Sequence, residues 1–107
     1  MKCREYFAIE AKNNKSFKEY IKNINCAFSQ NALHVKHSFQ NTVTDDDYDH
    51  IILNQIILKK DFYLDIDFIL GGSREYLKLN CLVLAFSNEK INETKSKLED
   101  ICGIKNA

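Results

Sequence analysis

DFYLDIDFIL (residues 61–70) alternates apolar and polar residues over most of its length. One set of alternate positions is apolar and comprises Phe62, Leu64, Ile66 and Phe68. The other set comprises Asp61, Tyr63, Asp65 and Asp67. Successive side chains of a β-strand point to opposite faces of the sheet, so this period of two predicts a strand. One face of that strand is expected in the core, and the other is expected to be an acidic ladder.

Strands with the same period are predicted on both sides of this stretch, at residues 3–11, 32–43 and 76–86. The paired glycines Gly71-Gly72, followed by Ser73, are typical of a turn before the last of them. That last segment is apolar at consecutive positions from Cys81 onward. Such a run favours a strand in the interior of the sheet, partly covered by helices.

The segment 50–58 is compatible with two structures, because it contains two apolar triplets, Ile51–Leu53 and Ile56–Leu58. In a helix, Thr44 would be the cap, and Lys59 and Lys60 would lie at the negative end of the helix dipole. We favour a strand because the two triplets contain four isoleucines, which are enriched in strands. The residues 59–61 then form a hairpin turn.

Two helices are expected to complete the domain. Ser16-Phe17-Lys18-Glu19 has the form of a capping box and predicts a helix at about 17–26. Ser87 or Asn88 caps a last helix, which ends at Gly103. The order β-α-β-β-β-β-α predicts a single α+β domain spanning residues 1–107. We expect an antiparallel sheet of about five strands with two helices on one face.

The charges are segregated along a chain that is neutral as a whole. Residues 41–70 carry seven acidic and two basic groups, and seven of the eight aspartates lie there. Two tyrosines lie among these aspartates, a combination typical of surfaces that bind basic partners. The predicted partner-binding residues are Asp61, Tyr63, Asp65 and Asp67, together with Asp45, Asp46, Asp47, Tyr48 and Asp49.

Two alternatives for the aspartates stay open. They can be solvated charges that keep a sheet face soluble and prevent edge-to-edge pairing. They can also bind a divalent metal ion through Asp65-x-Asp67 and the cluster at 45–49, in a metal-dependent enzyme or a metal-regulated domain. That cluster lacks the glycine and the closing glutamate of a calcium loop. We therefore expect neither a metal nor another cofactor.

Other chemistry has little support in the sequence. His34 and His37 fall on opposite faces of a predicted strand, and no cysteine has the context of a nucleophile. The four cysteines are widely spaced, which is typical of free thiols in a cytosolic protein. The basic residues of the first half fall short of a nucleic-acid-binding domain. No membrane-length apolar stretch and no signal peptide is recognisable.

We therefore expect a small cytosolic protein-binding module without enzymatic activity, in the form of a monomer or a weak homodimer. The favoured class is a bacterial immunity or inhibitor protein, which neutralises a nuclease-type toxin by covering its basic active site. A phage-encoded inhibitor of a host nuclease would have the same properties. A homo-oligomeric structural domain that pairs through a strand edge is a further alternative. No motif relates the chain to a known family.

Overall fold

The computed structural model describes residues 2–12, 17–43, 49–70 and 76–102. Its elements follow the predicted order. They are β1 (Cys3–Lys12), α1 (Phe17–Phe28), β2 (His34–Val43), β3 (Asp49–Leu58), β4 (Phe62–Leu70), β5 (Tyr76–Ala85) and α2 (Asn88–Cys102). The predicted α+β class is confirmed, and so is the strand at 50–58, which the sequence alone left open to a helix.

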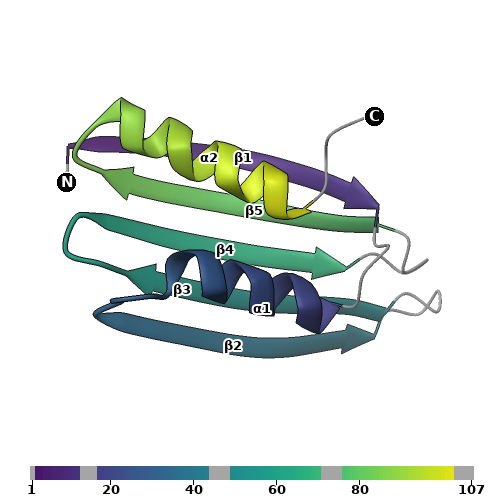
Figure 1. Ribbon diagram of the computed structural model, residues 1–107. Helices are drawn as coiled ribbons and strands as arrows, with labels where there is room; N and C mark the ends of the chain where they lie inside the picture. Colours follow the sequence, from purple (N-terminus) through teal and green to yellow (C-terminus); the bar gives the residue numbers. More distant parts are fainter. Residues whose placement is uncertain (1, 13–16, 44–48, 71–75, 103–107) are drawn as a thin grey trace.

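The five strands form one antiparallel sheet in the order β1-β5-β4-β3-β2 (Figure 1). Strands β2 to β5 are neighbours both along the chain and in space, whereas β1 pairs with β5 at the far edge. Strands β3 and β4 are joined by a tight turn, which is closed by the Lys59 amide donating to the Phe62 carbonyl oxygen at 2.8 Å. The predicted turn at 59–61 is therefore confirmed.

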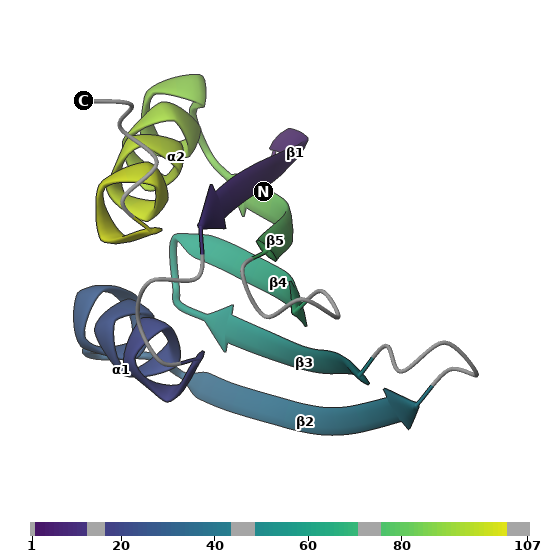
Figure 2. The same ribbon diagram turned by 90° about the vertical axis from the view of Figure 1, so that its right-hand side faces the viewer.

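Both helices lie on the same side of the sheet (Figure 2). Helix α2 lies over β1 and β5, and α1 lies over β2 and β3 (Figure 1). Ser87 directly precedes α2, and its Oγ accepts a hydrogen bond of 3.2 Å from the Lys90 amide. This is an N-cap bond, which satisfies one of the amide groups that a helix leaves free at its start. The predicted cap at 87 or 88 is thus Ser87.

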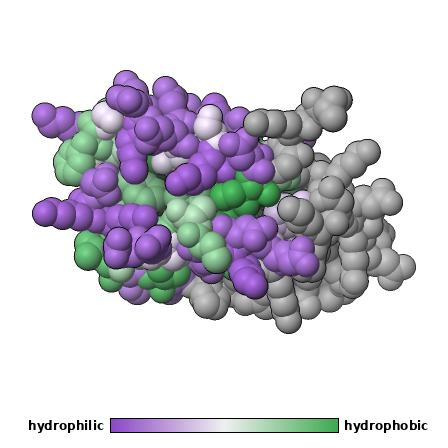
Figure 3. Space-filling view, in the orientation of Figure 1, coloured by the Kyte–Doolittle hydropathy of each residue, from purple (hydrophilic) through white to green (hydrophobic). Residues whose placement is uncertain are grey.

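The core lies between the sheet and the two helices. Every second residue of β4 and β5 faces the helices and is buried, as the alternation in the sequence predicts. Seen from the helix side, hydrophilic residues cover most of the described surface, and an apolar strip lies between the helices (Figure 3). The buried strand residues are Ile9, Ile57, Phe62, Leu64, Ile66, Phe68, Leu77, Leu79, Cys81, Val83 and Ala85. From the helices, the core receives Tyr20, Ile24, Phe28, Ile91, Leu98 and Cys102.

Gln55 is a polar exception in this core, with an exposed fraction of 0%. It lies in β3 and faces α1, where its Nε2 donates to the Asn25 side-chain oxygen. Ser29 donates to the same oxygen at 2.9 Å. The Oε1 of Gln55 is buried and has no hydrogen-bond partner among the described residues. An unsatisfied buried acceptor costs about 1–3 kcal/mol, which offsets what the bond between Gln55 and Asn25 contributes to stability.

The cysteines differ enough in environment to allow a chemical test. Cys26 is exposed, whereas Cys81 is buried and desolvation raises the pKa of its thiol to about 12. Because the thiolate is the reactive form, Cys26 is expected to react rapidly with Ellman's reagent at pH 8, and Cys81 only after unfolding. Cys26→Ser is expected to remove the fast phase. A fast phase of unchanged size in that variant would contradict the assignment.

Candidate functional site

The side of the sheet opposite the helices is here called the open face, and neither of the two helices of the described residues lies against it (Figure 2). It carries the residues that alternate with the core positions, and these are half-buried or exposed. From the three strands β1, β5 and β4 they are Arg4, Tyr6, Ala8, Glu10, Lys78, Asn80, Leu82, Leu84, Tyr63, Asp65, Asp67 and Ile69. From β3 they are Asn54, Ile56 and Leu58.

Asp65 occupies an apolar setting on the open face. The strand register places Leu82 of β5 on one side of it and Ile56 of β3 on the other. Its Oδ1 is buried and has no hydrogen-bond partner among the described residues. Burial raises the pKa of the Asp65 carboxyl above 3.8, and the charge of nearby Asp67 raises it further. Asp65 therefore has one carboxylate oxygen, Oδ1, that is buried without a hydrogen-bond donor among the described residues.

Asp67, two residues further along β4, lies in a polar setting instead. Its cross-strand neighbours are Asn80 of β5 and Asn54 of β3. The Asn54 side-chain Nδ2 donates to Asp67 Oδ1 at 2.8 Å. This bond fixes the orientation of the Asp67 carboxylate. The two aspartates of the ladder therefore differ in their hydrogen bonding. Asp67 is held by Asn54, and the Oδ1 of Asp65 has no donor among the described residues.

Aromatic side chains border the two aspartates. Tyr63 pairs with Leu84 and Leu58 across the sheet. Burial raises the pKa of the Tyr63 hydroxyl, and the negative charge of Asp65 raises it further. Tyr6, on the edge strand β1, is 63% exposed. The Arg4 guanidinium lies 4.7 Å from the centre of the Tyr6 ring and also donates to its hydroxyl oxygen. The Tyr6 ring therefore already binds one cationic group of the chain itself.

A cavity of about 500 Å³ opens where these strands meet. Its lining combines Tyr6 and Ala8 of β1, Asp65 and Asp67 of β4, and Asn80 and Leu82 of β5, together with Phe7 and Cys81. Two carboxylates, an aromatic ring and an apolar wall suit a cationic side chain with an aliphatic stem. A lysine or arginine entering from a partner can lay its stem on Leu82 and give Asp65 the missing donor.

The structure brings together only part of the predicted site. Asp65, Asp67 and Tyr63 share the open face as predicted. Asp61 does not extend their ladder, because it is exposed in the turn between β3 and β4. Asp45, Asp46, Asp47 and Tyr48 lie outside the described residues. Asp49 begins β3, and its side chain lies outside the described part of the chain.

The sequence reasoning missed the residues that make the ladder a cavity. Tyr6 and Leu82, which line this cavity, are not among the residues predicted for the site. The register of β1 and β4 against β5 places both beside Asp65. The alternation around Tyr6 and the apolar run after Cys81 predict two strands. Only the strand order shows that these strands are neighbours and that Tyr6 and Leu82 lie on one face.

Asp65→Asn is expected to stabilise the isolated protein at neutral pH. The folded-state pKa of Asp65 is raised, so folding disfavours the charged carboxylate, and the resulting destabilisation grows as the pH rises through that pKa. Because the side chain is only partly shielded from water, we expect a gain below about 1 kcal/mol at pH 7. The gain should vanish near pH 3, where the carboxyl is protonated in both states. Urea unfolding at both pH values measures this.

Asp61→Asn is the matched control, since Asp61 lies exposed in the neighbouring turn. An equal gain in both variants would show that general relief of negative charge is responsible. A loss of stability in Asp65→Asn at pH 7 would contradict the uncompensated setting of Asp65.

Two further observations concern other kinds of site. Within the described residues, no group of three or more His, Cys, Asp or Glu side chains is placed to hold a metal ion. No helix in the described ranges is long and apolar enough to cross a membrane. Comparison with known proteins finds no matching family model and no matching curated protein. The function must therefore be argued from the geometry of the chain.

Proposed function

We propose that this chain is a protein-binding inhibitor module that binds a basic partner with its open face. The observation that carries the proposal is the Asp65 carboxylate, whose Oδ1 is buried without a donor in a cavity shared with Asp67. A group in this state is costly in the isolated chain and favourable when a cation reaches it. Binding a lysine or arginine of a partner would supply that cation.

The surroundings of Asp65 support a protein partner. Leu82, Leu84 and Ile56 are half-buried on the open face, and Tyr6 is largely exposed at its edge. Tyrosine is enriched in protein–protein hot spots, and the apolar residues around the aspartates would exclude water from the contact. The apolar residues would supply affinity, and the aspartates would select a partner of opposite charge.

The favoured class of partner is a nuclease-type toxin, and the chain would then be an immunity or inhibitor protein of the bacterial cytoplasm. A nuclease presents lysines and arginines to the phosphates of its substrate, so a surface that offers carboxylates among apolar residues can cover it. A phage-encoded inhibitor of a host nuclease would use the same chemistry. The composition of the open face supports this mode of binding. The binding experiment below identifies which toxin is bound.

The test is to immobilise the chain and to challenge it with purified bacterial nuclease toxins and with acidic proteins of similar size. We expect a basic nuclease to be retained, to be inhibited at equal molar amounts, and to be released by rising salt. Retention of acidic proteins alone would contradict the proposal. Retention of a nuclease that stays active would show binding away from its active site and would contradict the inhibitor function.

A further inference from the structure

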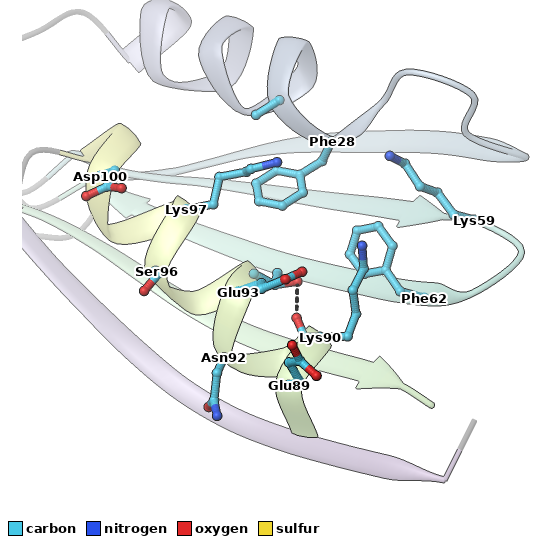
Figure 4. A pocket seen from close by; sticks show the side chains of 12 residues that line it. Phe28, Lys59, Phe62, Glu89, Lys90, Asn92, Glu93, Ser96, Lys97 and Asp100 are labelled. Atoms are coloured by element: carbon cyan, nitrogen blue, oxygen red, sulfur yellow. Dashed lines mark hydrogen bonds between the residues drawn. The ribbon is translucent and has the colours of Figure 1, made fainter. Parts of the chain in front are cut away.

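A second cavity, of about 860 Å³, lies on the helix side of the molecule, away from the open face. It is bounded by the end of α1, by one side of α2 and by the turn between β3 and β4. Figure 4 shows three lysines from two of these elements at the cavity, Lys59 from the turn and Lys90 and Lys97 from α2. Their side chains extend towards the rings of Phe28 and Phe62.

The three ammonium groups gather around the two phenylalanine rings. The Nζ atoms of Lys59 and Lys90 lie 5.6 and 5.5 Å from the centre of the Phe62 ring, so they share one ring. The Nζ of Lys97 lies 5.3 Å from the centre of the Phe28 ring. The two ring centres are only 6.0 Å apart. Three positive charges are thus concentrated over one apolar floor.

Mutual repulsion makes this arrangement unfavourable in the isolated chain. Burial lowers the pKa of Lys59, and the charge of Lys90 lowers it further, with Lys97 acting in the same direction. Asp61 acts in the opposite direction. Three carboxylates, of Glu89, Glu93 and Asp100, also line the cavity. Within the described residues, no ion pair of 4.0 Å or less joins Glu89 or Glu93 to these three ammonium groups.

We propose that this cavity binds a small polyanion, a molecule that carries two or more phosphate or carboxylate groups. Three lysines on different turns and elements can each contact a different anionic oxygen, which a single anionic group would not require. The volume lies in the range of small-molecule sites, about 300–1,000 Å³. A cation–π contact at an exposed site is weak, so a polyanion can draw the lysine ammonium groups away from the rings.

The test titrates the whole chain with inorganic pyrophosphate and, separately, with citrate, by calorimetry at low salt. We expect saturable binding of at least one of them at one site, with inorganic phosphate bound at least about tenfold more weakly. Lys90→Gln and Lys97→Gln are each expected to lower the affinity at least about tenfold, since a lost hydrogen bond to a charged group has that size. Binding of pyrophosphate but not citrate would assign the site to phosphates.

Lys95→Gln is the matched control. Lys95 lies on the same helix and also places its Nζ over a ring, 5.4 Å from the centre of Phe7, but it pairs with Glu5 at 3.8 Å and does not line the cavity. We expect its affinity to stay within about twofold of the parent. An equal loss in Lys95→Gln would reduce the effect to overall charge and would overturn the proposal. Absence of saturable binding of both anions at millimolar concentration would overturn it as well.

Discussion

Phe68→Ala is expected to lower the free energy of unfolding by about 3–5 kcal/mol, the range for truncating a buried phenylalanine. Phe68 has an exposed fraction of 0% and lies in β4, the central strand of the sheet. Its backbone neighbours across the sheet are Leu79 and Leu53, and it belongs to the buried core cluster. Removing the ring leaves a cavity that a packed sheet cannot close. Since domains of this size are stable by only about 5–15 kcal/mol, the loss is a large part of the total.

Urea unfolding followed by circular dichroism measures the effect of Phe68→Ala. Ile69→Ala is the control, because Ile69 is the next residue of the same strand, is half-buried and points to the open face. It is expected to cost less than about 2 kcal/mol. Similar losses in the two variants would mean that the alternation of β4 does not separate a core face from an open face, and would contradict the described fold.

The double substitution Asp65→Lys/Asp67→Lys is expected to weaken binding of a basic partner at least about 100-fold. Truncating one member of a desolvated charge pair costs about 2–5 kcal/mol, and reversal adds repulsion to that loss. Both positions line the open-face cavity, and long lysine stems can lie along its apolar wall without unfolding the strand. The measurement is calorimetry with the retained nuclease, and with hexa-arginine as a defined cationic probe.

Asp61→Lys is the matched charge reversal, since Asp61 lies on the same hairpin but exposed in its turn. It is expected to change affinity less than about fivefold, as rim charges do at interfaces. An equal loss from Asp61→Lys would indicate long-range charge attraction without an open-face site. Full binding by the double variant, in a protein that unfolds like the parent, would refute the site.

The fold could be predicted to the level of elements because most segments have a clear period in their apolar residues. The strand at 61–70 and the helix at 17–26 were predicted from local signals alone, and Ser16 of the predicted capping box lies outside the described residues. The segment 50–58 was ambiguous because its buried position Gln55 is polar. The hydrogen-bond partner of Gln55 is Asn25 on α1, 30 residues away in sequence, and no local sequence pattern predicts that contact.

The candidate site could be predicted only as a row of aspartates. What distinguishes Asp65 from Asp67 is the chemistry of their cross-strand neighbours, Leu82 and Ile56 for the first, Asn80 and Asn54 for the second. These neighbours are set by strand order and register, which the sequence did not specify. The lysine cluster of the second cavity also depends on tertiary packing. Lys59 and Lys97 lie near each other only because the β3–β4 turn packs beside α2.

The pairing of β1 with β5 also has a consequence for how the chain acquires its structure. Lys12 pairs with Tyr76, so this ladder closes a much longer loop than the three hairpins of β2 to β5. Loop closure of that length costs entropy before any contact is gained, so we expect the hairpins to form first and β1 to be added last. During synthesis, β1 leaves the ribosome first but must wait for β5. Until then the edge of β5 lacks its partner strand, which makes that interval the one most open to aggregation.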